Sequence, residues 1–343
     1  MKKIILLIIC ILMLCCGCTN NKNKENQLNV LNWSSYIPDS VLNDFEKETG
    51  IKLNYSTYSS NEEALAKISS AKIGTYDMVF PSDYMVSLMK EKGLLEKLDK
   101  TKITNLNNLD TNYLNLEFDP NNEYSLPFLV ATMLIAYNSE NIKENITGYN
   151  DLLNSKYKND IVLIEDQRIV IGMALLALGY DMNEIDDKKL EEAKNWILEL
   201  KKNIKAFDSD SPKTFLITEE VNIGILWNAE GAIAHNYNPN IKIVYPKEGF
   251  AISLDNYCIL KGAQNKENAY KFIDYLLRED VMAKIISEYP YKNINIESNK
   301  YLDTEYVNNI AANTPTELLS KSHFVKNIGH NIEKYDMLWA EIK

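Results

Sequence analysis

Apolar residues in the first hundred positions alternate between two periods, one of two residues and one of three to four. The two-residue period predicts short strands at residues 28–32, 51–58 and 76–80. A helical stripe follows each strand: from residue 39 or 40 to Gly50, from Ser60 onward with Glu63 completing a capping box, and over 83–98. Strands and helices in alternation predict a parallel sheet with helices on both faces.

The same alternation resumes in the second half of the chain. Further strands are expected at 161–164, 223–227 and 241–245, and further helices at 168–178, 187–203 and 267–289. The chain has 343 residues and is 45% apolar, and about 325 residues remain after the N-terminal leader described next. That length is large for one hydrophobic core and indicates two domains.

The N-terminus has the pattern of an export signal. Two lysines at positions 2–3 precede thirteen apolar residues at 4–16, which is too short a run to span a bilayer comfortably. A basic start, an apolar stretch of this length and a small-residue exit are typical of a cleaved leader. We therefore expect residues 1–17 to be a signal peptide.

The exit of this leader resembles a bacterial lipobox. Gly17 precedes Cys18, which would be lipidated and become the mature N-terminus. The leucine usually found three residues upstream is Cys15 here, so Cys16 is a second choice for the anchor, and a plain cleaved signal is the alternative. Residues 18–27 are polar and suit a flexible tether. The chain is expected outside the cytoplasm, at a membrane.

Charge and cysteine content narrow the function further. The net charge is −11, and loss of the two leader lysines leaves 35 basic against 48 acidic residues, or −13. An acidic excess argues against nucleic acid and suits cationic ligands. Four of the five cysteines lie in the leader, which leaves Cys258 alone and excludes a disulfide framework.

Patterns for metal binding and for catalysis are missing from the sequence. His235, His323 and His330 share no ligand-like spacing with one another or with Cys258. Neither a G-x-S-x-G nucleophile motif nor a phosphate-binding glycine loop occurs. We therefore expect no metal, no cofactor and no enzymatic activity.

Aromatic and hydroxyl side chains follow two of the predicted strands, at the point where each strand ends. Trp33, Ser34 and Tyr36 come directly after the first strand, and Ser82 and Tyr84 follow the third. In parallel α/β sheets ligands bind beyond the carboxyl ends of the strands. These side chains therefore predict a binding site, the alternative being aromatic residues that only cap their own core.

Carboxylates and a second tryptophan occupy equivalent places in the second half. Asp166 follows the strand at 161–164, Trp227 and Glu230 follow the one at 223–227, and Asp255 precedes an apolar run. Each acid alone would be typical of a solvated loop. Together with the aromatic residues they indicate a cleft for an elongated organic cation, because aromatic faces attract cations and carboxylates bind ammonium groups.

Several longer stretches carry a resemblance to a known family. They are "NWSSYIP", "FEKETGIKLNYSTYSSNE", "YDMVFPSDYMV", "FDPNNEYSLPF", "FDSDSP", "YPKEG" and "LLREDVMAKI". In this order, and nearly end to end, the chain resembles the periplasmic spermidine/putrescine-binding proteins of polyamine ABC transporters. The resemblance implies an α/β, two-lobed periplasmic-binding-protein fold, type II-like, with crossover strands and a ligand cleft between the lobes. By analogy one lobe takes 28–131 and 255–299, and the other takes 135–251 and 302–343.

The resemblance also implies a function. The protein would capture putrescine, spermidine or both and deliver the amine to the permease of an ABC transporter, as a monomer anchored by lipid in the periplasm or at the cell surface. The ligand positions of the family fall on Trp33, Ser34, Tyr36, Ser82, Tyr84, Asp166, Trp227, Asp255 and Tyr289, and Glu230 matches an aspartate of putrescine-preferring relatives. Asp255 would bind the central amine and Asp166 a terminal one.

Some positions depart from the spermidine pattern of the family. Ser35 and Ile169 replace two acids, Ser253 replaces a tryptophan, and a glutamine falls on Val325 or its neighbour. The loss of two acids leads us to expect that putrescine binds at least as tightly as spermidine. A binding protein for another amine or an amino acid, and a lipoprotein that only mediates interactions, remain the alternatives.

Overall fold

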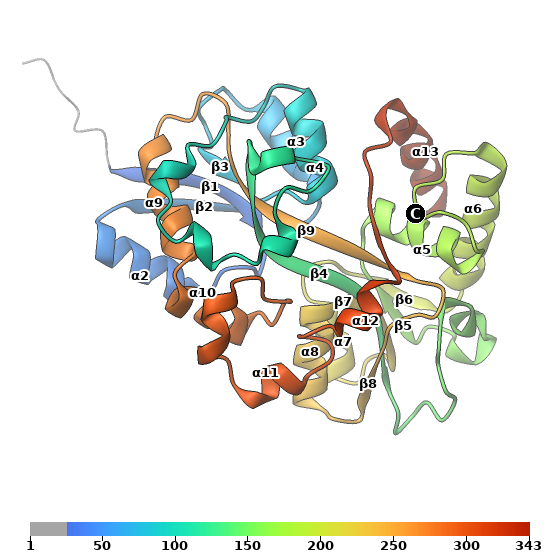
Figure 1. Cartoon of the computed structure of the whole chain (residues 1–343). Helices are drawn as coiled ribbons and strands as arrows, with labels where there is room; N and C mark the ends of the chain where they lie inside the picture. The colour runs from blue at the N-terminus through green and yellow to red at the C-terminus, as the bar shows by residue number, and fades with distance from the viewer. Residues whose placement is uncertain (1–25) are drawn as a thin grey trace, which may run out of the picture.

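A computed structural model describes residues 26–343 of the chain. The predicted signal peptide at 1–17, the lipidation candidates Cys16 and Cys18, and most of the predicted tether lie outside the described residues. The described part forms two lobes side by side, with two long strands crossing from one lobe to the other (Figure 1).

The strands are β1 Gln27–Trp33, β2 Lys52–Tyr58, β3 Met78–Val79, β4 Ser125–Asn138, β5 Ile161–Leu163, β6 Ile204–Phe207, β7 Ile223–Trp227, β8 Ile241–Val244, β9 Phe250–Ile259 and β10 Ser322–Phe324. The helices are α2 Asp39–Thr49, α3 Asn61–Ser70, α4 Asp83–Glu91, α5 Gln167–Ala177, α6 Asp187–Lys201, α7 Lys213–Ile217, α8 Asn228–Tyr237, α9 Lys266–Leu276, α10 Glu279–Glu288, α11 Thr304–Asn308, α12 Thr316–Leu319 and α13 Ile332–Ile342.

The strands pair in the order β2-β1-β3-β9-β4-β7-β5-β6, with β10 beside β9 and β8 beside β4. Within each lobe the outer strands are parallel, as predicted: β1 to β2 and β3, and β5 to β6 and β7. The predicted parallel pairing does not extend to the centre, because β4 and β9 run antiparallel to each other and to β7 and β3. Both central strands are buried along their whole length, so no alternation marks them in the sequence.

The two lobes share these central strands. The lobe that we call the first contains β1, β2 and β3 with helices α2, α3, α4, α9 and α10, and the second contains β5 to β8 with α5 to α8 and α13 (Figure 1). The first half of β4 pairs with β9, and its second half pairs with β7 and β8. The exact lobe boundaries expected from the resemblance stay a prediction.

The helices begin and end where the local chemistry directs, with three corrections to the prediction. The Ser60 hydroxyl accepts the backbone N–H of Glu63 at 3.2 Å, while the Glu63 carboxylate accepts from Ser59 rather than Ser60. The helix predicted over 83–98 ends at residue 91, and Gly93 has a φ of 67°, which favours glycine. The helix predicted over 267–289 is divided into α9 and α10.

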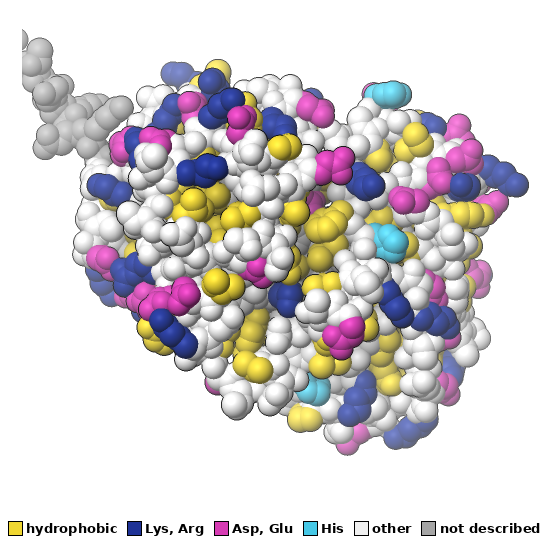
Figure 2. Space-filling model, viewed as in Figure 1, with side chains coloured by type: hydrophobic (Ala, Val, Ile, Leu, Met, Phe, Trp, Pro, Cys, Tyr) yellow, Lys and Arg dark blue, Asp and Glu magenta, His cyan; other side chains and the backbone are white. Residues whose placement is uncertain are grey.

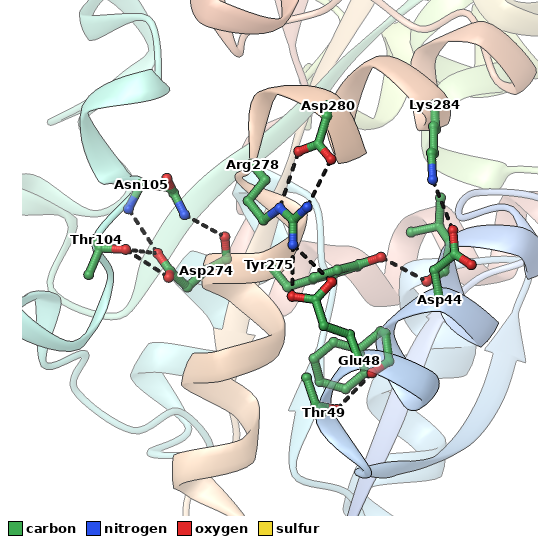
Figure 3. A network of polar contacts seen from close by, with 12 residues as sticks. Asp44, Glu48, Thr49, Thr104, Asn105, Asp274, Tyr275, Arg278, Asp280 and Lys284 are labelled. Carbon is green, nitrogen blue, oxygen red and sulfur yellow. Dashed lines mark hydrogen bonds and ion pairs between the residues drawn. The ribbon is translucent and has the colours of Figure 1, made fainter.

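The break between α9 and α10 is held by a polar network (Figure 3). The Arg278 guanidinium lies 2.8 Å from Glu48 of α2 and 2.8 Å from Asp280, the second residue of α10. Lys284 of α10 lies 2.9 Å from Asp44 of α2. Exposed ion pairs add little stability. These pairs nevertheless connect α10 to α2, and the segment after α10 forms part of the wall of the cavity described below.

Acidic and basic side chains are interspersed over the face drawn in Figure 2, and hydrophobic side chains gather near its centre, between the lobes. Within residues 26–343, no helix combines the length and the apolar character needed to cross a membrane. The same residues contain no group of three or more His, Cys, Asp or Glu side chains that could hold a metal ion.

Candidate functional site

A cavity of about 70 Å³ lies between the two lobes, which is room for roughly five or six water-sized groups. Its walls come from the strand ends and helix starts of both lobes. The lining residues are Trp33, Ser34, Tyr36, Ser59, Asn61, Ser82, Asp83, Tyr84, Ala131, Asp166, Arg168, Ile169, Ser209, Trp227, Ser253, Asp255, Tyr291 and Val325. A cavity of this volume suits a small ligand.

The structure brings together most of the residues that the sequence singles out. Trp33, Ser34, Tyr36, Ser82, Tyr84, Asp166, Trp227 and Asp255 all line the cavity, as do Ile169, Ser253 and Val325, the positions that depart from the spermidine pattern. Glu230 and Tyr289 are not among the lining residues. The sequence reasoning did not assign Ser59, Asn61, Ala131, Arg168, Ser209 and Tyr291 to the site.

The topology explains why these distant residues meet. Trp33 is the last residue of β1, and Ser35 in the following turn has a φ of 51°, which places the chain in a sharp bend. Ser82 precedes α4, Asp166 precedes α5, and Trp227 ends β7. The carboxyl ends of parallel strands thus face the cavity from both lobes.

Aromatic rings form one wall of the cavity. The Trp33 ring lies 4.6 Å from the ring of Tyr58 and 6.5 Å from that of Tyr36, measured between centroids. The Tyr36 ring in turn lies 4.8 Å from Tyr291. Packed in this way the rings hold one another in place, and their faces offer apolar contact and negative electrostatic potential to a cation.

Asp255 of β9 is the most unusual group in the cavity. Its carboxylate is only 4% exposed and accepts hydrogen bonds from the hydroxyls of Tyr36, of Ser82 at 2.7 Å and of Ser253 at 3.3 Å. Burial raises the pKa of the Asp255 carboxyl to about 6, although the three hydroxyl donors oppose this shift. No Lys or Arg of residues 26–343 forms an ion pair with it. The carboxylate is therefore a buried anion whose counter-ion the described chain does not supply.

Asp166 and Arg168 also line the cavity, and Glu62 lies beside them without lining it. The Asp166 carboxylate accepts the backbone N–H of Ile169 at 3.0 Å, and burial raises its pKa. Glu62 accepts the Tyr84 hydroxyl at 3.0 Å, and burial followed by the charge of Asp166 raises the pKa of Glu62 to about 7. The buried Arg168 guanidinium, 5.6 Å from the centre of the Tyr84 ring, partly offsets both negative charges.

Glu230 and Tyr289 lie close to the cavity without lining it. Glu230 is 8% exposed, and one of its oxygens lies 2.7 Å from the Lys213 ammonium, so this buried acid has an internal counter-ion. Burial raises the pKa of Glu230, and Lys213 opposes that effect. Tyr289 is the residue that ends α10, and Tyr291, two positions later, lines the cavity. The roles expected of Glu230 and Tyr289 stay predictions.

Two hydrogen bonds bridge the lobes at the edge of the cavity. One oxygen of Asp210, in the loop after β6, accepts the hydroxyl of Ser34 at 3.0 Å and the hydroxyl of Ser59 at 3.1 Å. Both serines belong to the first lobe and the aspartate to the second. These contacts therefore join the two lobes at the edge of the cavity.

The model of the bacterial extracellular solute-binding protein family matches residues 40–314. The chain belongs to this family. The predictions of a binding protein and of a two-lobed fold are thereby confirmed.

Individual relatives agree with the family. The chain is 38% identical, over 322 residues, to a spermidine/putrescine-binding periplasmic protein of Salmonella typhimurium, covering 94% of this chain and 92% of the relative. It is similar to the solved structure of a putative spermidine/putrescine ABC transporter from Listeria monocytogenes, with 33% identity, a TM-score of 0.89, and coverage of 92% and 98%. A lipoprotein of Treponema pallidum is 27% identical, with a TM-score of 0.82 and coverage of 92% and 99%.

Proposed function

We propose that this family member binds a polyamine in the cavity between the lobes and delivers it to the permease of an ABC transporter. One observation carries the proposal: Asp255 is a buried carboxylate in an aromatic cavity, and its counter-ion must come from the ligand. An unpaired buried charge is costly, so a cation that fills this position gains a large part of its binding energy there.

The rest of the cavity fits the shape and charge of an alkyl polyamine. The rings of Trp33, Tyr36 and Tyr291 would contact a methylene chain in this small space, and Trp227 would add a further aromatic contact. Asp166, which also lines the cavity, would receive a second ammonium group. The proposed ligand-binding residues are Trp33, Ser34, Tyr36, Ser82, Tyr84, Asp166, Trp227 and Asp255, with Tyr291 added and with Glu230 and Tyr289 near the site.

The comparisons support the ligand and the setting. The Salmonella relative is named for spermidine and putrescine, and the Listeria structure for a spermidine/putrescine transporter. The Treponema relative is named a lipoprotein, which supports a lipid anchor on this chain as well. We propose that Cys18, or else Cys16, carries this anchor and holds a monomer in the periplasm or at the cell surface.

One observation favours a second candidate ligand. Arg168 lines the cavity, is 2% exposed, and could bind the carboxylate of an amino acid whose amine lies on Asp255. Against this, Asp166 and Glu62 lie close enough to the guanidinium to compensate its charge, as the causes of their pKa shifts show. The polyamine is therefore the better-supported ligand.

Calorimetric titration of the purified protein tests the proposal. Putrescine and spermidine should bind at one site, while lysine, γ-aminobutyrate, neutral sugars and divalent metals should give weak heats or none. Binding of an amino acid in preference to both amines would establish the second candidate. Binding of sugars or metals without amines would refute both.

A further inference from the structure

Asn61, the first residue of α3, makes a pair of hydrogen bonds to a single neighbour, Ser82. The Asn61 side-chain oxygen accepts the backbone N–H of Ser82 at 3.2 Å, and its amide nitrogen lies 3.1 Å from the Ser82 hydroxyl oxygen. That hydroxyl lies 2.7 Å from a carboxylate oxygen of Asp255. Asn61 is 3% exposed, so water cannot readily replace it in this chain of contacts.

The direction of each proton follows from the chemistry of the groups. A backbone N–H can only donate, so the Asn61 atom that faces it must be the oxygen, and the other atom must be the NH2 group. An NH2 group can only donate, so the Ser82 oxygen accepts from it. The single hydroxyl proton of Ser82 is thereby left to point at Asp255.

The surroundings of Asp255 make that proton important. The titratable groups that interact with it are Tyr36 in the turn after β1, Tyr58 at the end of β2, Tyr291, and Asp83 at the start of α4. Burial raises the pKa of Asp83 to about 8, so this neighbour is largely neutral at pH 7, and burial raises the pKa of each tyrosine above its ordinary value. None of these groups supplies a positive charge, so hydroxyl donors alone stabilise the Asp255 anion before a ligand arrives.

We propose that Asn61 is a positioning residue of the polyamine site, which keeps the Ser82 proton on Asp255 and so keeps that carboxylate ionised to receive an ammonium group. This inference rests on the proposed function for its biological meaning. Asn61 would act through Ser82 and then Asp255, and its removal would change the pH at which the site works rather than only the strength of binding.

The variant Asn61→Ala tests the proposal with two readouts. The first is the titration of the Asp255 carboxyl carbon, followed by NMR on the ligand-free protein, and the second is putrescine affinity measured from pH 5.5 to pH 8.5. A lost orienting contact to a charged acceptor should raise the Asp255 midpoint by about one pH unit. Putrescine affinity should then fall about fivefold relative to wild type at pH 6 and less than about twofold at pH 8.

Three further variants separate positioning from folding. Ser60→Ala removes the cap of the same helix, whose hydroxyl bonds Glu63, and should lower stability without moving the midpoint. In a Ser82→Ala background, Asn61→Ala should cause no additional shift, because its only route to Asp255 is gone. If Asn61→Ala does not fold, Asn61→Ser takes its place. The serine side chain is too short to make both contacts, so the same shift of the Asp255 midpoint is expected.

The outcomes are distinct for the two proposals. The role of Asn61 is overturned if Asn61→Ala leaves the pH midpoint of Asp255 unchanged. It is also overturned if Asn61→Ala shifts that midpoint as much in the Ser82→Ala background as it does in the wild type. A wild type that binds no amine overturns the proposed function, yet the NMR midpoints still decide whether Asn61 orients the proton.

Discussion

Replacement of Asp255 by asparagine should stabilise the ligand-free protein while it abolishes tight amine binding. The two side chains have nearly the same shape, so the substitution removes the charge and little else. In the wild type the buried carboxylate has only the hydroxyls of Tyr36, Ser82 and Ser253 to replace water. A site prepared for a cation is therefore costly until the cation arrives.

The pKa of Asp255 sets the size of this cost. Its value rises from 3.8 to about 6 on folding, and a shift of about two units corresponds to about 3 kcal/mol. Because the folded-state pKa is raised, the stability associated with this group is present below the unfolded pKa and is lost as the pH rises through 6. At pH 7.5 the full cost applies. Asparagine removes it, but its NH2 group must face a hydroxyl that now has to turn, so a net gain of about 1–3 kcal/mol is expected.

Thermal melting at several pH values measures this effect. Without ligand at pH 7.5, Asp255→Asn should melt about 2–6 °C above the wild type. At pH 5 the wild-type carboxyl is protonated, and the difference should shrink. Putrescine at about 100 times its dissociation constant should raise wild-type stability by about 2.7 kcal/mol and leave the variant unchanged, which reverses the order of melting.

Glu230→Gln provides a matched control. Glu230 is also buried, but Lys213 is its partner at 2.7 Å, so loss of this acid leaves an unpaired lysine and should lower stability. Opposite signs for the two acids would support the reasoning. An Asp255→Asn variant that melts below the wild type at every pH, or that keeps wild-type affinity, would show that Asp255 is an ordinary structural carboxylate.

Three more predictions concern affinity, selectivity and motion. Trp33→Ala and Trp227→Ala should each weaken putrescine binding by about 1–3 kcal/mol in calorimetry, through lost apolar contact and cation–π attraction, and unchanged constants would remove them from the site. Ile169→Glu should shift preference toward spermidine by about tenfold in competition between the two amines, and no shift would mean that other residues recognise the third amine. Asp210→Asn, which weakens the bridge to Ser34, should give a less compact ligand-free particle in small-angle scattering, with compactness restored by putrescine; a profile identical to wild type would deny the bridge a role in closure.

Much of the fold could be predicted from local patterns in the sequence. The strands and helices of each lobe follow two clear periods, and β7, predicted at 223–227, occupies those residues in the structure. The central strands gave no such signal, because β4 and β9 are buried on both faces and β9 pairs with partners far away in the sequence. Their antiparallel direction depends on how the lobes are joined, which no short window of sequence records.

The candidate site could also be predicted in part, from residues at the ends of the predicted strands. Strand ends carrying Trp33, Ser82 or Asp166 are visible in the sequence because the topology places such positions at one edge of a sheet. Asn61 follows β2 by the same rule and could have been found, although an amide at the start of a helix is ordinary. Tyr291 could not, since it reaches the cavity from the segment after α10, whose course is set by the packing of that helix.

The crossing strand β9 has a consequence for biosynthesis. Val79 of β3 pairs with Cys258 of β9 in the sheet, so the sheet of the first lobe lacks its inner strand until nearly 180 further residues have been synthesised. Contacts this distant in sequence slow folding, because a long loop must close before they form. A nascent chain whose first lobe cannot fold early remains unfolded and can still pass through a secretion channel. The strand crossing between the lobes would thereby also favour export.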